Sequence, residues 1–376
     1  MPALLAKLSP YFQEANLSNI SLIAPLTQGL SNDNYYVRAR HPSQAQEAEW
    51  VLRLNSWASS QICNRDSEVA NWRLASDANL APKIVYVSLG NTFYVSEFFA
   101  QNEQCCWSEL MAANSSHPIK STRESWPGAE RKLLQLLNGL QSLPLPHNEI
   151  TLDSQWHIYQ ERLAGMQAKI LPILQHGSQR PSEVPESCLL VILKRWQHLY
   201  TNLCDSGCSI NNMLVNLAGC MVNLQYSHRD LNPYNVLVVD DKLKCIDFEY
   251  ACSSHPLCDL AAVIASHSLS STQRHWLISQ YLKNNPNLNQ TADKGVESAV
   301  DLYWVFAVCW ALQMAFDSLL ADFDIGLELE TYLTEQTVFA KGEDSNAAAL
   351  KRDDYHSVYE YLDCAEQYFK LISSCT

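Results

Sequence analysis

The first hundred residues alternate between hydrophobic and polar positions with the period of β-strands, and one helical stretch interrupts them. The alternation predicts a hairpin over 21–40, a strand over 49–54 and a strand pair over 81–99. Residues 64–79 instead repeat their apolar positions with the period of a helix. We therefore predict a small N-terminal lobe of about residues 1–98 that is mostly β-sheet and contains one helix.

Beyond this region the hydrophobic pattern changes to that of amphipathic helices. Helices are predicted at about 129–146, 153–174, 186–203, 271–284, 296–320, 325–340 and 345–373. Residues 100–128 are polar and irregular, and no internal repeat occurs. The pattern predicts an α+β fold, with a larger, mainly helical C-terminal lobe over 99–376.

One polar segment inside the helical part, residues 226–250, departs from this pattern. It has the sequence YSHRDLNPYNVLVVDDKLKCIDFEY, in which two short apolar runs flank the turn DDK. A β-hairpin there brings Asn235, at the start of the first run, near Asp247, at the end of the second. Both side chains offer the hard oxygen ligands that Mg²⁺ binds. Asp230, on the preceding loop, can accept the proton of an attacking hydroxyl group, as phosphoryl transfer requires.

This segment matches the kinase catalytic-loop pattern H-R-D-L-x-x-x-N in full, from His228 to Asn235. Short strings of this kind also recur by chance, so an ordinary polar turn followed by a strand-end carboxylate is the alternative interpretation. The second carboxylate, Asp247, lies at hairpin distance and favours the kinase interpretation.

Polar residues of the predicted small lobe fit the same chemistry. The tip of the first hairpin carries Ser31, Asn32 and Asn34, whose short side chains can turn toward phosphate groups. An ordinary hairpin turn explains these three residues equally well. Arg53 on the next strand and Glu68 in the first turn of the helix match the ion pair that positions a nucleotide phosphate in kinases. The alternative is a surface salt bridge, which contributes little to stability.

The last predicted strand of the small lobe ends in Glu97 and Phe98, where this lobe connects to the larger one. We expect these two residues to contact ATP. After the catalytic segment, Asp259 opens an apolar helix, where it could cap the helix or brace the backbone of the catalytic loop.

Composition and charge exclude several classes of protein. The chain has 376 residues, enough for two domains or lobes, and its 47% hydrophobic and 18% charged residues are typical of a globular protein. The net charge of −14 argues against nucleic acid or an anionic membrane as a partner. The field of such a charge can favour a cationic substrate, but many acidic proteins use their charge for solubility alone.

The remaining sequence features concern location and covalent structure. The 13 cysteines are scattered without a C-x-x-C pair, which favours reduced thiols over disulfides or zinc ligands. The N-terminus lacks the long apolar run of a signal peptide. No apolar stretch reaches the ~18–20 residues that a membrane span needs, and the longest, 303–316, predicts a buried helix. We expect a cytoplasmic protein without a membrane span, and the sequence leaves open whether it is a monomer or a homodimer.

Taken together, these motifs resemble the choline/ethanolamine kinase and aminoglycoside phosphotransferase superfamily, and in particular its choline kinase and thiamine kinase branch. The matching pieces run from GLSN at 29–32 through VLRL, the helix start with Arg65 and Glu68, LAPKIVY, HRDLNPYNVLV and IDFEYA to PLCDLA at 256–261. The resemblance covers about residues 20–340 and is loose over 100–220. It implies a protein-kinase-like bilobal fold that uses ATP and Mg²⁺ to phosphorylate the hydroxyl group of a small molecule.

The resemblance also implies a role for each matching residue. Asp230 corresponds to the base, Asn235 and Asp247 to the metal ligands, and Arg53, held by Glu68, to the phosphate clamp. An arginine on the small-lobe strand and IDFEY at the metal site are the choline kinase pattern. Protein kinases instead have Phe-Gly after the metal-binding Asp and a later A-P-E segment, which this chain lacks.

The substrate is less tightly defined by these motifs. Choline kinases are expected to hold a quaternary ammonium group with aromatic faces and carboxylates. The corresponding candidates here are Glu249, Tyr250 and Trp310, with Asp230 at the reacting hydroxyl group. Trp310 matches the first tryptophan of the choline kinase W-x-x-W pair, but Gln313 replaces the second, which weakens the case for choline itself.

An alcohol of the choline, ethanolamine or thiamine type is therefore the expected acceptor. One alternative is phosphorylation of an aminoglycoside or another antibiotic. A second is a pseudokinase-like module that binds a nucleotide without transfer, although the intact base and metal ligands argue against it. Tyr303 and Trp304 lie on the same predicted helix as Trp310, and for them packing in the core is the favoured interpretation.

Overall fold

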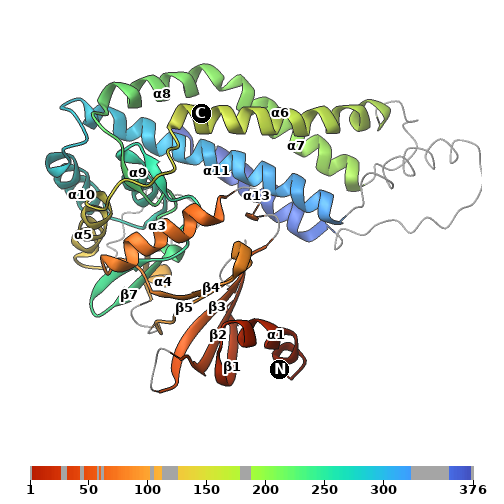
Figure 1. Cartoon of the computed structure of the whole chain (residues 1–376). Coiled ribbons are helices and arrows are strands. Elements are labelled where there is room, and N and C mark those ends of the chain that lie inside the picture. The colour runs from red at the N-terminus through yellow and green to blue at the C-terminus, as the bar shows by residue number, and fades with distance from the viewer. Residues whose placement is uncertain are drawn as a thin grey trace, which may run out of the picture. The chain divides into compact units, whose positions relative to one another are not determined.

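The computed structural model of the chain describes residues 2–26, 32–42, 46–56, 59–60, 63–101, 106–111, 126–177, 188–322 and 355–373 (Figure 1). The chain forms two compact units, each assembled from two separate stretches. The first unit contains residues 1–151 and 217–300, and the second contains 152–216 and 301–376. The lobe boundary expected after residue 98 stays a prediction.

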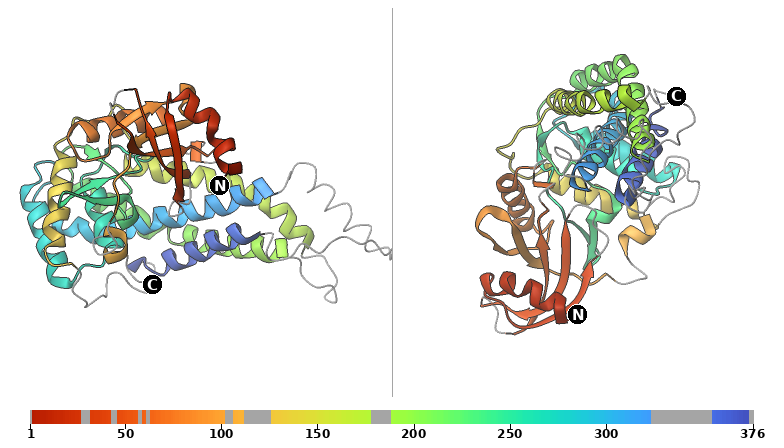
Figure 2. Two further views of the ribbon diagram at one scale, coloured as in Figure 1. Left: turned by 90° about the horizontal axis from the view of Figure 1, so that it is seen from below. Right: turned by 90° about the vertical axis from the view of Figure 1, so that its right-hand side faces the viewer.

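The first unit begins with a five-stranded antiparallel sheet. In chain order its strands are β1 (Ser18–Leu26), β2 (Asp33–Arg40), β3 (Ala48–Leu54), β4 (Ile84–Val87) and β5 (Phe93–Glu97), and in the sheet their order is β1-β2-β3-β5-β4. Helix α1 (Pro2–Glu14) lies next to these strands (Figure 2), where Leu8 and Phe12 join alternate strand residues in a hydrophobic core. The strand register aligns Asn34, Arg53 and Tyr94 across β2, β3 and β5. The hairpin and strands predicted from the alternating pattern are confirmed.

Helix α3 (Arg65–Asp77) connects β3 to β4, where the sequence predicts a helix. Its start is fixed by Asn64, whose side chain accepts a hydrogen bond from the backbone N–H of Ser67. Trp72 in the middle of the helix donates its indole N–H to the backbone oxygen of Pro82 and stacks on Phe248, with ring centroids 5.9 Å apart. Helix α3 is therefore packed directly against the IDFEY segment.

The remainder of the first unit is mainly helical and contains two short strand pairs. Its helices are α4 (Trp107–Met111), α5 (Ala129–Gln141), α9 (Leu257–Ser266) and α10 (Ser271–Asn284). Strand β6 (Gln225–Ser227) pairs with β9 (Cys252–Ser254), and β7 (Val236–Val239) pairs with β8 (Lys242–Cys245). The β7–β8 turn consists of Asp240 and Asp241, both with positive φ (49° and 62°), as hairpin turns of type I′ require. This hairpin was predicted from the sequence.

The second unit is built from helices. They are α6 (Leu152–Gly177), α7 (Cys188–Asp205), most of α8 (Gly207–Cys220), the later part of α11 (Ala292–Asp322) and α13 (His356–Phe369). Arg195 on α7 pairs with Asp363 and Glu366 on α13, at 2.6 and 2.5 Å. The sequence did not predict α8. The helix predicted at 325–340 and the beginning of that at 345–373 lie outside the described residues.

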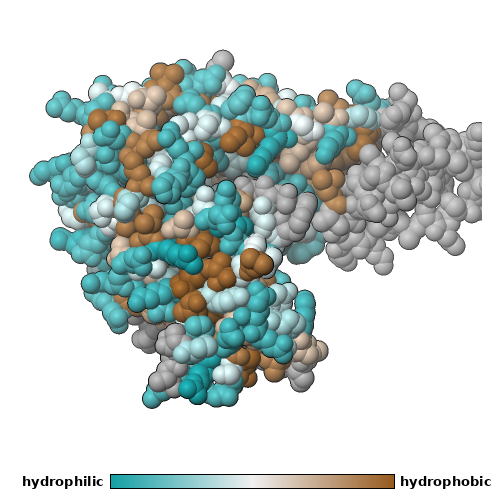
Figure 3. Space-filling model, viewed as in Figure 1, coloured by the Kyte–Doolittle hydropathy of each residue, from teal (hydrophilic) through white to brown (hydrophobic). Residues whose placement is uncertain are grey.

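Among the described helices, α11 is long and apolar enough to cross a membrane. Its mean hydropathy reaches 1.5 over 18 residues within Ala292–Leu320, and 78% of that window is buried inside the structure. The expectation that no apolar stretch reaches this length does not hold for α11, although the prediction of a buried helix over 303–316 does. Hydrophobic residues are interspersed with hydrophilic ones on the face drawn in Figure 3. Helix α11 therefore resembles the core helix of a globular protein.

The predicted α+β fold is confirmed by this architecture, which combines an antiparallel N-terminal sheet with a mainly helical remainder. All cysteines whose side chains the structure describes are free thiols.

Candidate active site

The loop between β6 and β7 holds Asp230 by both of its carboxylate oxygens. The Nδ2 of Asn232 donates to Oδ1 at 2.9 Å, and the Nδ2 of Asn235 donates to Oδ2 at 2.7 Å. Burial raises the pKa of Asp230, and these two amide hydrogen bonds oppose part of that rise. A carboxylate that is oriented in this way and made more basic is suited to accept a proton.

His228 connects this loop to the end of β8. Its Nδ1 accepts the backbone N–H of Asp230 at 3.4 Å, and its Nε2 lies 3.0 Å from the backbone oxygen of Ile246. Burial lowers the pKa of His228 to about 4, so the ring is neutral at pH 7 and its Nε2 carries the proton toward Ile246. The positions of Asp230 and of the residue before Asp247 thus depend on one neutral imidazole ring.

Asp259, in the first turn of α9, fixes the backbone of the same loop. Its Oδ1 accepts from the Ser227 hydroxyl and the Arg229 N–H, both at 2.8 Å, and its Oδ2 accepts from the His228 N–H at 2.9 Å. Arg229 has a left-handed φ of 70°, which these bonds help to hold. Of the two roles that the sequence leaves open, the structure shows the brace, because Pro256 occupies the N-cap position of α9.

Asn235 and Asp247 lie at the two ends of the β7–β8 hairpin. The backbone N–H of Ile246 donates to the backbone oxygen of Asn235 at 3.0 Å, which ties these ends together. Because the amide nitrogen of Asn235 is bound to Asp230, its Oδ1 is left without a partner among the described residues. Asp247 has a φ of 68°, and its Oδ1 lies 3.1 Å from the Nη1 of Arg53. An amide oxygen and a carboxylate form a donor set that fits Mg²⁺.

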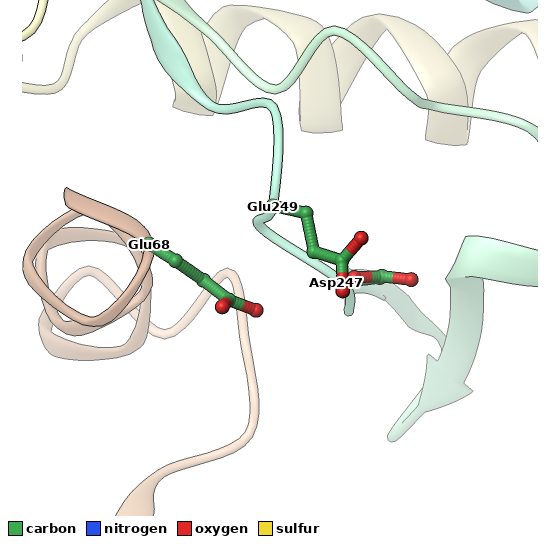
Figure 4. Close-up of side chains that lie close together, drawn as sticks. All are labelled: Glu68, Asp247 and Glu249. Carbon is green, nitrogen blue, oxygen red and sulfur yellow. The ribbon is translucent and has the colours of Figure 1, made fainter. Parts of the chain in front are cut away.

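Three carboxylates converge beside this hairpin. Glu68 points from α3 toward Asp247 and Glu249 (Figure 4), and one oxygen atom of each lies within 4.8 Å of the others. Arg53 contacts all three: its Nη1 lies 3.1 Å from Asp247, and its Nη2 lies 3.1 Å from Glu68 and also pairs with Glu249. The predicted Arg53–Glu68 pair is present. With side-chain exposures of 8% and 0%, it is a buried pair, not the surface salt bridge that was the alternative.

The pKa values of the two carboxylates after β8 shift in opposite directions. Burial and the neighbouring carboxylates raise the pKa of Asp247, while Arg53 acts against them. Burial also acts to raise the pKa of Glu249, but Arg53 and Arg65 outweigh it and bring that pKa below its usual value. Glu249 is therefore held in its charged form by its cationic neighbours.

Glu249 is bound by donors from the N-terminal part of the chain. Besides Arg53, its Oε1 accepts from Asn32 Nδ2 at 2.6 Å, Ser59 Oγ at 2.8 Å and Arg65 Nη1 at 2.9 Å. The sequence assigned Glu249 to the substrate, but in this structure its carboxylate is bound by side chains of residues 32–65. Its role toward the substrate stays a prediction.

Arg65 and Ser59 were not assigned a role from the sequence. The signal that could have identified Arg65 is its spacing of three residues before Glu68, which places the two side chains on one face of α3. Their contact, from Nη1 to Oε2, measures 2.7 Å. No comparable local signal pointed to Ser59.

The residues assigned to ATP are only partly brought together. Ser31 lies outside the described residues, and Asn34 donates its Nδ2 to the backbone oxygen of Asn32 at 3.2 Å. The Glu97 side chain accepts from the backbone N–H of Lys83 at 2.9 Å. These contacts fix the tip of the hairpin and the edge of the sheet, and the nucleotide roles of these residues stay predictions.

Phe98, which follows β5, packs face to face on Tyr36 of β2, with ring centroids 4.0 Å apart and ring planes inclined by 18°. The Tyr36 hydroxyl donates to Glu49 Oε1 at 2.5 Å, and the Phe98 N–H donates to the Glu49 backbone oxygen at 3.1 Å. The sequence pointed to Phe98 but missed its partner Tyr36.

The aromatic candidates for the substrate belong to different units. Tyr250 follows Glu249 in the first unit and is half-buried. Trp310 belongs to the second unit, where its ring meets Tyr361 edge-on at 5.6 Å. Trp304 is 6% exposed and stacks on Tyr368 at 5.4 Å, which confirms core packing for this residue. The substrate roles of Tyr250 and Trp310 stay predictions.

Comparison with known proteins gives three kinds of match. In the first, protein LicA of Haemophilus influenzae is 36% identical over 70 residues, which cover 19% of this chain and 26% of LicA. The matched segment therefore spans about a quarter of the length of that relative.

The second kind is a likeness to solved structures. A choline kinase from Cryptosporidium parvum is 14% identical with a TM-score of 0.48, and the match covers 98% of this chain and 94% of that one. A spectinomycin phosphotransferase, solved with ADP and spectinomycin, is 11% identical with a TM-score of 0.46, at coverages of 97% and 98%.

The family assignment rests on a broader match. The model of the choline/ethanolamine kinase family matches residues 23–339, which include the catalytic loop, both candidate metal ligands and the Arg53–Glu68 pair. Because this match covers most of the chain, the protein belongs to the choline/ethanolamine kinase family of small-molecule phosphotransferases.

Proposed function

We propose that the protein transfers the γ-phosphoryl group of ATP to the hydroxyl group of a small amino alcohol of the choline, ethanolamine or thiamine type. The observation that carries this proposal is the hydrogen-bonded group formed by Asp230 and Asn235, together with the Arg53–Asp247 ion pair. These residues all belong to the first unit. Asp230 supplies the catalytic base, Asn235 and Asp247 supply two oxygen ligands, and Arg53 supplies a cation for the phosphates.

Asp230 acts as the base in the proposed reaction. It accepts the proton of the substrate hydroxyl group while the alcohol oxygen bonds to the γ-phosphorus, and the bond from that phosphorus to the β,γ-bridging oxygen breaks to release ADP. The hydrogen bonds from Asn232 and Asn235 fix the carboxylate against rotation, and burial strengthens it as a base.

The donor set at the β7–β8 hairpin fits a magnesium ion. Asn235 would offer its free Oδ1, and Asp247 its carboxylate. When bound there, Mg²⁺ supplies positive charge that neutralises the phosphate oxygens of the nucleotide. Arg53, aligned between Asn34 and Tyr94, binds the phosphates from the sheet.

The strand register supports a direction for the nucleotide. Val51 lies two residues before Arg53 on β3, and it is aligned with Tyr36 on β2 and with Ser96 on β5. Two strand residues span ~7 Å, so this second row lies about one nucleoside length from the phosphate clamp. We place the adenine ring of ATP toward Tyr36 and Phe98, in keeping with the assignment of Phe98 to ATP.

Cationic alcohols are favoured as substrates by the net charge of −14 and by the aromatic candidates Tyr250 and Trp310. Because Gln313, and not a second tryptophan, follows Trp310, choline is not preferred over ethanolamine or thiamine. A cytoplasmic location, where ATP is available as the phosphoryl donor, is part of this proposal.

The test is ATP consumption by the purified protein with Mg²⁺ and a panel of choline, ethanolamine, thiamine, homoserine and kanamycin. Turnover with one amino alcohol, absent in Asp230→Asn, is the expected result. Turnover with kanamycin alone would move the function to antibiotic phosphorylation. A protein that binds ATP but turns over none of the five would contradict the proposed class of acceptor.

A further inference from the structure

Arg65 uses its entire guanidinium group inside the first unit. Its Nε donates to Ser60 Oγ at 3.1 Å. Its Nη1 donates to two carboxylates, Glu68 Oε2 at 2.7 Å and Glu249 Oε1 at 2.9 Å. Its Nη2 donates to Ser59 Oγ at 2.9 Å and to Asn32 Oδ1 at 3.4 Å. Five hydrogen bonds equal the full donor capacity of an arginine side chain. Only 8% of the side chain is exposed, so these bonds are made largely out of contact with water.

Arg65 shares two of its carboxylates with Arg53. Both arginines bind Glu68 and Glu249, whereas Arg53 is the one cation that pairs with Asp247 among the residues the structure describes. Three carboxylates therefore face two guanidinium groups, and Arg53 contacts one carboxylate more than Arg65 does.

This sharing matters because the proposed function requires Arg53 to change partners. Arg53 must bind nucleotide phosphates, and Asp247 must become available as a metal ligand. A buried carboxylate that loses its cation is strongly destabilised. Arg53 can therefore turn to the phosphates only if Glu68 and Glu249 stay neutralised when it weakens its hold on them.

We propose that Arg65 is a positioning residue that keeps Glu68 and Glu249 neutralised, and thereby frees Arg53 to bind the phosphates of ATP. This inference rests on the proposed function. The Nη1 of Arg65 already binds both carboxylates, so Arg65 itself has no need to move. Its bond to Asn32, which also donates to Glu249, ties the tip of the β1–β2 hairpin to the same group.

A direct contact between Arg65 and the nucleotide is the competing explanation. It would require Arg65 to give up hydrogen bonds that it already makes, since all five of its donors are used. The two explanations differ in what happens when Arg65 and Glu249 are neutralised together. If Arg65 acts by balancing charge, removal of its carboxylate partner compensates for its loss, and if it binds phosphate directly, no compensation occurs.

The experiment measures binding of a non-hydrolysable ATP analogue with Mg²⁺ to the full chain by calorimetry, with a thermal unfolding curve for every variant. Arg65→Gln is expected to weaken binding by about tenfold or more, as for strongly coupled neighbours. Glu249→Gln leaves binding equal to or tighter than wild type. The double variant Arg65→Gln/Glu249→Gln returns to within about threefold of wild type.

Two further variants complete the design. Arg65→Lys keeps the charge but loses the five-donor fork, so it should weaken binding less than Arg65→Gln does. Arg195→Gln is the matched control, because Arg195 also pairs with two carboxylates, Asp363 and Glu366, outside the site. It should bind the analogue as wild type does.

The outcomes separate this inference from the proposed function. If the wild-type chain binds no ATP analogue, both the proposed function and the role of Arg65 are overturned. If wild type binds, a folded Arg65→Gln with unchanged affinity, or a folded double variant as weak as Arg65→Gln, overturns the role of Arg65 alone. Should Arg65→Gln fail to fold, the charge-balanced double variant and Arg65→Lys still decide: the double variant must bind within about threefold of wild type.

Discussion

The chemistry at the scale of single residues depends on one carboxylate and the amides that orient it. Asp230→Asn keeps the size of the side chain and removes its capacity to accept a proton. We expect kcat to fall by about 10²–10⁴, the usual contribution of a general base. Affinity for an ATP analogue should stay nearly unchanged, because Arg53, the proposed phosphate ligand, contacts Asp247, Glu68 and Glu249 and not Asp230. Steady-state kinetics and calorimetry check the two expectations, and turnover within tenfold of wild type would exclude Asp230 as the base.

A second residue-scale prediction concerns Trp310. If its ring holds the cationic group of the alcohol, Trp310→Ala should raise the KM for the alcohol by about 2–30-fold, the range of a cation–π contact. The KM for ATP should stay the same. Trp310→Phe is the matched control, since it keeps an aromatic ring at this position, where Trp310 meets Tyr361 edge-on. Equal increases in both KM values would indicate that Trp310 packs in the core and does not bind the substrate.

At the scale of elements, the first turn of α9 determines the shape of the catalytic loop through Asp259. Asp259→Asn keeps the volume but turns one hydrogen-bond acceptor into a donor. In the place of Oδ2 this donor faces the His228 N–H, and in the place of Oδ1 it faces the Arg229 N–H and the Ser227 hydroxyl. An unsatisfied buried donor costs about 1–3 kcal/mol, so the free energy of unfolding should fall by that amount. Urea titration measures it.

The matched control is Asp241→Asn in the β7–β8 turn. The Asp241 side chain is 87% exposed and pairs only with Lys132 at 2.5 Å among the contacts described for it, so the same substitution should change stability little. Equal losses in the two variants would show that Asp259 does not brace the loop. In Asp259→Asn we also expect kcat to fall more than the affinity for an ATP analogue, because the loop carries Asp230.

The same scale explains which elements could be predicted from the sequence. The β7–β8 hairpin and helix α3 were predicted because neighbouring residues determine them: two acidic turn residues in one case and the Asn64 cap in the other. Helix α8 was missed: its sequence GCSINNMLVNLAGC contains two glycines and three asparagines, residue types that favour turns and loops over helix interiors. Where a helix is largely buried, as α11 is, its length is set by packing and not by a local pattern.

The candidate site divides in the same way. Asn235 and Asp247 were placed together because a hairpin joins them, and Arg53 and Glu68 because a strand and the next helix carry them. The partners of Glu249 could not be predicted, since Asn32 and Arg65 precede it by 217 and 184 positions. Only tertiary packing brings such distant segments together, and no single-sequence pattern records it.

At the scale of the whole molecule, neutral buried histidines link folding to pH. Burial lowers the pKa of His228 and His255 to about 4 and that of His267 to about 3, against about 6.5 in the unfolded chain. Between these values the unfolded chain binds more protons than the folded one. The stability that these neutral histidines contribute is therefore fully present above pH 6.5 and is lost as the pH falls toward 4. Within this range each of them lowers the free energy of unfolding by about 1.4 kcal/mol per pH unit.

His267 provides the direct test of this linkage. Its Nε2 accepts the indole N–H of Trp107 at 3.0 Å, an arrangement that a protonated ring cannot keep and that a glutamine oxygen can replace. His267→Gln should therefore flatten the fall in the free energy of unfolding between pH 6 and 5 by about 1.2 kcal/mol. Urea titrations at both pH values measure it, and the comparison with wild type cancels the carboxylates that titrate in both. If His267→Gln kept the full wild-type slope, the buried ring of His267 would not be the source of the pH dependence. The neutral, hydrogen-bond-accepting state assigned to it in the folded chain would then be wrong.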